Sequence, residues 1–441
     1  MNTLSESINV YPYLQNVTKD SITIMWETNE PTIGTVNYGE SKELGKSLSD
    51  QSPQKIHEIK ITGLDAGKLY YYQVSYNDTK LPISFFKTSP PDMTKTFRLA
   101  VYGDSRSNIT NHSKVAKLIL DSNPDLIINT GDLVTNGDVY EQWKNEFFMP
   151  LRDVIDHIPI YTCIGNHERN SPNYYNYLSL PNNESYYSFD YANAHFICLN
   201  TISELYDESS PQYKWLIDDL EKNKDGKWII VFFHSPLFRA HRTRGIEPQR
   251  YVWQPIFDKY GVDIVLNGHD HNYTRIYPVG YLSDKPKKGV QHIITGGGGA
   301  PLYDIAEGRS YVQASNKVHH SITMDFDGDN MTAVVKDIEG NIIDRFEIDR
   351  TKTTKPNEYV AYEMFELERE LRKAIDKLVP VIADKEIKIN TSITVKTNFP
   401  IKLKGTMSWN SDTKWKINPI SNNFELDPRE DLLIPIQAEV D

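Results

Sequence analysis

Hydrophobic and polar residues alternate at every second position in short runs over the first ninety residues. Four such runs are separated by polar or glycine-rich turns: 21–26, 35–38, 57–61 and 70–74. A period of two is the pattern of a strand with one buried face, and short strands at this spacing are typical of a small β-sandwich. We therefore expect an all-β domain over residues 1–92, with Pro90-Pro91 in the linker that leaves it.

From residue 97 to about 349 the pattern changes to apolar runs that alternate with helical segments. The apolar runs expected to be strands are 98–102, 126–128, 158–161, 228–233 and 262–266. The segments expected to be helices are 114–120, 140–148, 213–220 and 250–259. This alternation predicts a layered α/β domain over 93–352. Because 186–199 and 319–348 have the pattern of antiparallel hairpins, the sheets should be mixed.

A third region, 353–441, is expected to contain a helix followed by a β-rich accessory module. After a polar linker, Met364, Leu367 and Leu371 lie on one helical face, and Pro380 ends the helix. Alternating apolar residues then predict a second all-β module. No catalytic pattern occurs in it, so we expect it to serve packing or association.

The charge of the chain argues against nucleic acid as a partner. The formal net charge is −12 and no long Lys/Arg run is present, whereas nucleic-acid binding needs a cationic surface. An anionic substrate must therefore be attracted by something local, such as bound cations. The composition leaves the oligomeric state open.

The compartment is less constrained. No run approaches the ~20 apolar residues of a membrane helix, so no transmembrane segment is expected. Cys163 and Cys198 lie in apolar runs and are expected to be buried thiols, with a disulfide as the lesser alternative. The first residues lack a signal-peptide pattern. We expect a secreted or cell-surface protein whose signal peptide is not part of this sequence, and a cytoplasmic location stays open.

Polar clusters that can carry chemistry follow the apolar runs of the central region. They are Gly103-Asp104-Ser105-Arg106, Gly131-Asp132, Gly165-Asn166-His167-Glu168, Phe233-His234 and Gly268-His269-Asp270-His271. Any one of them has a plain reading, as a helix cap, a turn or a buried histidine. Five such clusters at the ends of successive strands are better explained as one ligand site, because ligand sites form at the carboxyl ends of strands. Asp, Asn and His together suit Zn, Mn or Fe.

The ordered blocks resemble those of the calcineurin-like metallophosphoesterases, and within them the purple acid phosphatase branch. Residues 1–92 add to the likeness because they resemble a fibronectin type III-like module with Trp26 in its core. The resemblance covers roughly 8–349. It implies a four-layer α/β (α+β) sandwich with mixed sheets, flanked by all-β sandwich modules. It also implies a phosphatase with two metal ions (Fe, Zn or Mn) that hydrolyses small phosphate esters, with monoesters favoured.

The resemblance also implies a role for each residue of the blocks. The metal ligands would be Asp104 and His271 for the first ion, Asn166, His234 and His269 for the second, and Asp132 for both. A hydroxide between two ions about 3.5–4 Å apart would attack phosphorus. His167 would protonate the leaving oxygen, and Glu168 would orient the His167 imidazole.

The chain departs from the family pattern at two positions. Thr135 stands where purple acid phosphatases have a tyrosine, so we expect no tyrosinate–iron colour. Arg106 stands where the wider superfamily has a histidine, which leaves the first ion with three certain ligands. We expect Arg106 to bind a phosphate oxygen through its planar fork, with surface solvation as the alternative.

A basic loop follows His234 and contains His241 with Arg239, Arg242 and Arg244. It is expected either to line the substrate pocket, with His241 close to the chemistry, or to be a solvated surface loop. Two other functions remain open at this stage. One is a phosphodiesterase or nucleotide pyrophosphatase at the same site, and the other is a non-catalytic binding or adhesion protein with a degenerate metal site.

Overall fold

A computed structural model of the chain describes residues 7–202, 206–224, 226–241, 244, 247–279, 289–306 and 311–352, and in the C-terminal part 387–395, 403–408, 415–427 and 430–440. The chain divides into two compact units. The first consists of 1–277 with 290–353, and the second of 278–289 with 354–441. The expected helix around 364–378 and Arg242 lie outside the described residues.

The N-terminal part of the first unit consists of two antiparallel sheets. One has the order β1 (Ile8–Gln15), β2 (Ser21–Thr32), β5 (Gln54–Thr62), and the other has the order β4 (Lys46–Ser49), β3 (Gly34–Gly39), β6 (Leu69–Tyr76), β7 (Thr79–Lys80), with β8 (Ser84–Lys87) also paired to β6. Burial alternates along β5 and β6 as the sequence pattern predicts. Trp26, Val36 and Tyr72 are buried, so both sheets contribute to the core. The predicted all-β arrangement of this part is confirmed.

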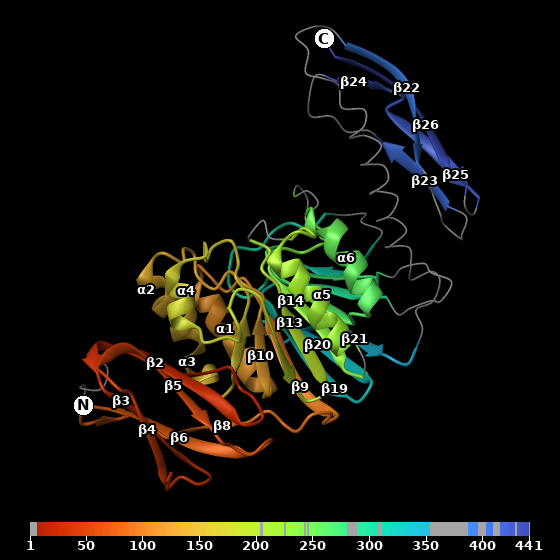
Figure 1. The fold of residues 1–441 in the computed structure, drawn as a ribbon. Helices are drawn as coiled ribbons and strands as arrows, with labels where there is room; N and C mark the ends of the chain where they lie inside the picture. Colours follow the sequence, from red (N-terminus) through yellow and green to blue (C-terminus); the bar gives the residue numbers. More distant parts are fainter. Residues whose placement is uncertain are drawn as a thin grey trace. The chain divides into compact units, whose positions relative to one another are not determined.

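Two mixed sheets form the larger part of the first unit (Figure 1). The six-stranded sheet has the order β11 (Ile160–Thr162), β10 (Leu126–Asn129), β9 (Thr96–Tyr102), β19 (His320–Asp327), β20 (Asn330–Asp337), β21 (Ile342–Asp349). The seven-stranded sheet has the order β12 (Tyr187–Tyr191), β13 (Ala194–Cys198), β14 (Trp228–Phe233), β15 (Ile264–Asn267), β17 (Gln291–Thr295), β16 (Tyr273–Ile276), β18 (Val312–Asn316). The first-named three strands of the six-stranded sheet are parallel, and the hairpins predicted from the sequence supply antiparallel partners. The prediction of mixed sheets is therefore confirmed.

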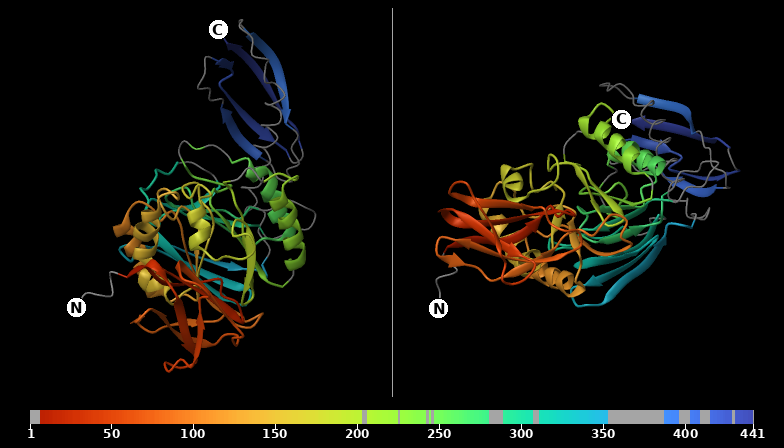
Figure 2. Two further views of the ribbon diagram at one scale, coloured as in Figure 1. Left: turned by 60° about the vertical axis from the view of Figure 1, so that its left-hand side comes forward. Right: turned by 60° about the horizontal axis from the view of Figure 1, so that its bottom comes forward.

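Helices cover the outer faces of the two sheets and complete a four-layer arrangement. Helices α1 (Ile109–Ser122) and α3 (Met149–Ile155) lie on one side, and α5 (Pro211–Asn223) and α6 (Gln249–Tyr260) lie on the other. Figure 2 shows the orange and green helices on opposite sides of the sheets in both of its views. Aromatic side chains fill the space between the sheets: Phe97 stacks on Phe326 at 4.4 Å and lies 6.3 Å from Phe196 on the facing sheet. The fold class predicted from the sequence is confirmed.

The helix predicted over 140–148 is broken into pieces of different geometry. A short helix α2 (Tyr140–Gln142) leads into a π-helical segment, η1 (Trp143–Phe148), which continues into α3. Single π-turns inside helices occur often at functional sites. Here the π-helical segment carries Glu146, a residue to which the sequence assigned no role. A further short helix, α4 (Pro172–Tyr177), begins after the side-chain cap Ser171.

Hydrogen bonds join the N-terminal sheets to the four-layer part. The Tyr13 hydroxyl donates to the carbonyl oxygen of Tyr177 at 2.6 Å. The buried carboxylate of Glu27 accepts a hydrogen bond from the Tyr177 hydroxyl at 2.9 Å, and others from Tyr140 and Asn9. The two parts also share one continuous hydrophobic core. This contact places the sandwich against the segment that carries η1 and α4.

The second unit is β-rich, as the sequence predicts. Its described strands form one sheet of order β22 (Ile387–Val395), β26 (Leu432–Val440), β24 (Trp415–Asn418) and a pair β23 (Leu403–Ser408), β25 (Ser421–Leu426). The alternating apolar residues at 387, 389, 393 and 395 all belong to the single strand β22. Within the described part of the chain, no helix has the length and hydropathy needed to cross a bilayer. Cys163 and Cys198 are buried free thiols, as expected.

Candidate metal centre

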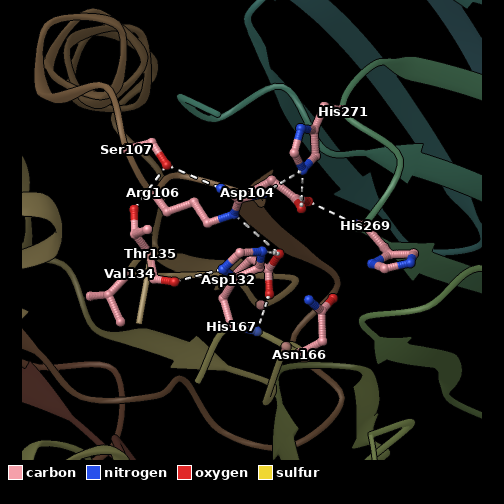
Figure 3. Close-up of polar contacts among 12 residues, drawn as sticks. Asp104, Arg106, Ser107, Asp132, Val134, Thr135, Asn166, His167, His269 and His271 are labelled. Atoms are coloured by element: carbon pink, nitrogen blue, oxygen red, sulfur yellow. Dashed lines mark hydrogen bonds and ion pairs between the residues drawn. The ribbon is translucent and has the colours of Figure 1, made fainter. Parts of the chain in front are cut away.

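The five polar blocks meet at the carboxyl ends of strands from both sheets. Asp104, Asp132 and the Asn166-His167 pair follow β9, β10 and β11 of the six-stranded sheet. His234 follows β14 of the seven-stranded sheet, and the remaining block follows β15. The sequence pattern suggested successive strands but not that they belong to two sheets. The candidate site therefore lies where the strand ends of the two sheets come together (Figure 3).

Glycines are needed where these blocks pack against one another. A Cβ atom at Gly165 would lie 2.2 Å from Asp132 Oδ1 and 2.4 Å from the Asp132 backbone nitrogen. A Cβ atom at Gly268 would lie 2.5 Å from Asp104 Oδ2. Only a hydrogen fits at either position, so these glycines allow the carboxylates to approach the neighbouring backbone.

Four ligand atoms with lone pairs converge around His234. Its Nδ1 lies 2.9 Å from the carbonyl oxygen of Thr130 and donates to it, which leaves Nε2 to face the other ligand atoms. That Nε2 lies 3.3 Å from Asp132 Oδ1, 3.2 Å from Asn166 Oδ1 and 3.1 Å from His269 Nδ1. A proton on His234 or His269 can satisfy only one of these contacts. The others bring lone pairs together, which a cation among them would turn from repulsion into ligation.

Another group of ligand atoms, at the position predicted for the first ion, lies beside these atoms and shares Asp132 with them. The Nδ1 of His271 donates to the carbonyl oxygen of Pro301 at 2.6 Å, so Nε2 carries a lone pair. This Nε2 lies 3.2 Å from Asp104 Oδ1. Asp104 Oδ1 is buried and has no hydrogen-bond partner among the described residues. Each group offers its ligand atoms within 4.8 Å of one another, one through Asp132, His234 and His269, the other through Asp104, Asp132 and His271. The residues present therefore fit two adjacent cations.

Burial and neighbouring charges act in opposite directions on the pKa values of the site. Burial would raise the pKa of Asp132, but His234 and His167 outweigh it and lower that pKa below its usual range. Burial would lower the pKa of His234, but Asp132 outweighs it and raises the pKa to about 9. Burial, with the nearby charge of His234, lowers the pKa of His269. Asp132 is thus held as a carboxylate, the form that binds cations.

The His167 imidazole is held by the backbone and not by Glu168. Its Nδ1 lies 2.6 Å from the carbonyl oxygen of Thr135, to which it donates. The opposite ring nitrogen, Nε2, is 3.9 Å from Asp132 Oδ2, and the side chain is 29% exposed. His167 therefore presents one ring nitrogen to the candidate site and has the other fixed (Figure 3).

The prediction that Glu168 orients His167 is wrong. Its carboxylate is buried and accepts backbone N–H groups of Asp132 at 2.9 Å, Leu133 at 2.7 Å and Gly165 at 2.7 Å. Glu168 thus fixes the backbone of the Asp132 block. Burial and the Asp132 carboxylate raise the pKa of Glu168 to about 7, whereas the backbone donors favour its charged form.

Arg106 lies against the ligand atoms predicted for the first ion and not in solvent. Its Nε lies 3.4 Å from Asp132 Oδ2 and its Nη2 lies 3.5 Å from His271 Nε2. The Arg106 side chain is 11% exposed. The alternative of a solvated surface arginine is therefore wrong.

Thr135 is bonded to residues outside the ligand groups. Its hydroxyl donates to Glu146 Oε2 at 2.8 Å and lies 2.9 Å from the Ser107 hydroxyl. The same Glu146 oxygen accepts the backbone N–H groups of Thr135 at 2.7 Å and Ser107 at 3.0 Å. Glu146 was missed by sequence reasoning, because a single acidic residue in a helical segment carries no pattern of its own.

The basic loop lies next to the last histidine block, but its described arginines are paired with carboxylates. Arg239 donates to Glu247 at 2.8 Å, and Arg244 donates to Asp270 Oδ1 at 2.9 Å. The Tyr303 ring stacks on His271 at 3.9 Å, and His241 packs edge-on against the same tyrosine at 5.2 Å. His241 is thus one ring removed from a candidate ligand, and its place in a substrate pocket stays a prediction.

Comparison with known proteins adds an independent view of the chain. A family model described as calcineurin-like phosphoesterase matches residues 97–273, and one described as purple acid phosphatase, N-terminal domain, matches residues 8–89. Purple acid phosphatase 18 of Arabidopsis thaliana is 31% identical over 314 residues, which cover 63% of this chain and 68% of that protein. Purple acid phosphatase 15 of the same plant is 30% identical over 287 residues, which cover 55% of this chain. The chain spans 53% of the length of that relative.

A solved structure has the same fold. The purple acid phosphatase PPD1 from yellow lupin (Lupinus luteus) seeds superposes with a TM-score of 0.67 at 20% sequence identity. The match covers 77% of this chain and 74% of the lupin protein.

Proposed function

The chain belongs to the calcineurin-like metallophosphoesterases, in the purple acid phosphatase branch, and from this membership we propose that it hydrolyses phosphate esters at a dinuclear metal centre. Phosphomonoesters are the favoured substrates, because that is what the branch resemblance implies. A secreted or cell-surface location, the domain limits 1–92, 93–352 and 353–441, and an accessory role for the last of these remain predictions.

The observation that carries this proposal is the convergence of buried lone pairs in two groups that share Asp132. Asp104 Oδ1 is buried without a hydrogen-bond partner among the described residues and lies 3.2 Å from His271 Nε2, while the other ring nitrogen of His271 donates to Pro301. The atoms around His234 are arranged in the same way. Buried acceptors that outnumber the donors around them are costly in a folded protein, and bound cations remove that cost.

Each residue has a defined task in the proposed reaction. When bound, two divalent ions supply Lewis acidity towards phosphoryl oxygens and make water nucleophilic at neutral pH. Asp132 would hold both ions, Asp104 and His271 would hold one, and the second would be held by Asn166, His234 and His269. The pairing of Nδ1 with the Thr135 carbonyl leaves His167 Nε2 to carry a proton towards the leaving oxygen.

The lack of a tyrosine ligand determines one visible property. Thr135 has no phenolate, and its hydroxyl is already bonded to Glu146 and Ser107. No tyrosinate-to-iron charge transfer can arise at this position, so the iron-loaded protein should lack the purple absorption band of this branch.

The proposal is tested by hydrolysis assays on two chromogenic esters. The chelator-treated protein is reloaded with Mn²⁺ or Zn²⁺ and given p-nitrophenyl phosphate or its bis ester. We expect metal-dependent release of p-nitrophenol, faster from the monoester. Asp132→Asn is the matched control, and its turnover should fall by more than about 100-fold, the upper range for residues that only orient a ligand. Metal-loaded protein that hydrolyses neither ester would refute the proposal, and faster release from the bis ester would refute the monoester preference.

A further inference from the structure

The two groups of ligand atoms differ in their basic neighbours. The guanidinium of Arg106 approaches the group predicted for the first ion, with Nε 3.4 Å from Asp132 Oδ2 and Nη2 3.5 Å from His271 Nε2. Around His234, the other contacts of Nε2 are a carboxylate, an amide oxygen and an imidazole. A guanidinium therefore contacts ligand atoms of the first position, whereas near the second position Arg244 donates to the backbone carbonyl of His269 and to the Asp270 carboxylate.

The Arg106 side chain is held at this place by its neighbours. Its Nη1 donates to the Ser107 hydroxyl at 3.1 Å, and its backbone N–H donates to the carbonyl oxygen of Asp132 at 3.3 Å. The Ser107 hydroxyl in turn lies 2.9 Å from that of Thr135. Because Arg106 is only 11% exposed, solvent screens its charge little. At these distances the guanidinium partly neutralises the Asp132 carboxylate and faces the lone pair of His271 Nε2.

The first position also offers fewer protein ligands. Asp104, Asp132 and His271 supply it, whereas Asp132, Asn166, His234 and His269 supply the second. Thr135, the residue at the family's tyrosine position, is turned to Glu146 instead. A divalent ion at the first position would be repelled by the guanidinium a few ångströms away. The two positions should therefore differ strongly in metal affinity.

We propose that the Arg106 guanidinium supplies the positive charge of the first metal position, and that an entering ion displaces this guanidinium towards the substrate phosphoryl group. This inference rests on the proposed function and deepens it. The second position fills first, and the first position fills only when the guanidinium leaves. A displaced guanidinium next to the metal centre can donate two parallel hydrogen bonds from its planar fork to two oxygens of a phosphate. Filling of the first position and phosphate binding are therefore coupled.

The coupling works in both directions. If phosphate draws Arg106 away from Asp132 and His271, it must raise the affinity of the first position for an ion, and the ion must raise the affinity for phosphate by the same factor. A substrate with a phosphoryl group thus helps to complete the centre that acts on it. Inorganic phosphate is the simplest probe of this coupling, because it carries the same oxygens.

The experiment measures metal binding to the chain of 441 residues, not turnover. Chelator-treated protein is titrated with Mn²⁺ by calorimetry, and bound metal is counted by elemental analysis after desalting. We expect wild-type protein to bind one equivalent tightly and a second at least about tenfold more weakly. Arg106→Gln removes the charge, so the affinity of the weaker binding step should rise by about tenfold and approach that of the tight step. Arg106→Lys keeps the charge and should retain two separate steps.

A matched control and a phosphate arm complete the design. Arg98→Gln removes an arginine that pairs with Asp325 away from the site, and it should leave both steps unchanged. Inorganic phosphate should tighten the weak step several-fold in wild-type protein and much less in Arg106→Gln. Two equal tight equivalents in wild-type protein, or identical binding by wild type and Arg106→Gln, would overturn the inference even if the protein is an active phosphatase. Two-step binding without ester hydrolysis would instead overturn only the proposed function.

Discussion

At the scale of single residues, three of the proposed ligands have backbone conformations that L residues rarely adopt. The φ angles are 56° at Asp104, 57° at Asp132 and 67° at His269. Such conformations cost about 1–3 kcal/mol each and persist only when the surroundings enforce them. The backbone N–H of Asp104 donates to the Gly131 carbonyl at 2.9 Å, and that of Asp132 to Glu168 at 2.9 Å. The candidate ligands are thus fixed in place by the neighbouring blocks.

The role of His167 can be separated from metal binding. His167→Ala removes the proton carrier but leaves all six proposed ligands, so turnover should fall by about 10²–10⁴-fold, the usual range for general acid catalysis. Elemental analysis of the same preparation should find the wild-type metal content. Loss of metal in His167→Ala would make this residue a ligand, and unchanged turnover would remove it from the reaction.

The residues of the site differ in how far the sequence could reveal them. The candidate ligands are predictable because Asp, Asn and His recur after glycine at the ends of apolar runs. The hydrogen-bond partner of His167 could not be predicted, because it is a backbone carbonyl and every residue has one. The folding of a loop places the carbonyl of Thr135 there. Glu168 misled the prediction for a related reason: its position next to His167 in the chain says nothing about the side to which its carboxylate turns.

At the scale of elements, the π-helical segment η1 connects the two sides of the site. It carries Glu146, whose Oε2 accepts hydrogen bonds from Thr135 and Ser107. The carbonyl oxygen of Thr135 holds His167, and Ser107 follows Arg106 in the chain. The carbonyl of Glu146 also lies 2.7 Å from the Nδ1 of the buried His112 in α1. Glu146 is thus a positioning residue, held from one side by α1 and acting on the site from the other.

Loss of the Glu146 carboxylate should loosen the Thr135 loop and with it the His167 imidazole. We expect Glu146→Ala to lower turnover by roughly 10–100-fold, as for residues that orient a functional side chain, with little change in KM or metal content. Glu146→Gln keeps an acceptor oxygen and should recover most of the activity. If Glu146→Gln is as impaired as Glu146→Ala, or if metal is lost in both, the effect is not one of positioning.

The elements themselves were largely predictable, because fully apolar runs and helical periodicity identify buried strands and covering helices. The runs at 98–102 and 228–233 became β9 and β14 with almost the predicted limits. Two features were not predictable. Assignment of the strands to two sheets depends on pairings between distant segments. The π-helical segment 143–148, in which Trp143 and Phe147 are buried, has the same apolar pattern as an α-helix.

At the scale of the whole molecule, the first unit contains every proposed ligand and the N-terminal sheets that pack against η1 and α4. Glu27 of β2 accepts hydrogen bonds from three residues at this contact, two of which belong to α2 and α4. The N-terminal sheets therefore support the segments that shape one side of the site, and they should unfold together with the four-layer part.

Replacement of Glu27 tests this coupling. Glu27→Ala leaves the buried Tyr177 hydroxyl without this acceptor, so the free energy of unfolding should fall by about 1–3 kcal/mol. Denaturant unfolding, followed by tryptophan fluorescence, should still show one transition for the first unit, because its core is continuous. A separate early transition for the N-terminal sheets would show that they fold independently of the rest.

The central claim is that buried lone pairs of residues distant in the chain converge to hold cations. Crystals grown with Mn²⁺ allow the most direct test, through anomalous scattering measured above and below the manganese edge. The account predicts an anomalous peak surrounded by Asp132, Asn166, His234 and His269, and at high Mn²⁺ a second one against Asp104 and His271. A map without a peak among these side chains, in protein shown to contain manganese, would contradict it.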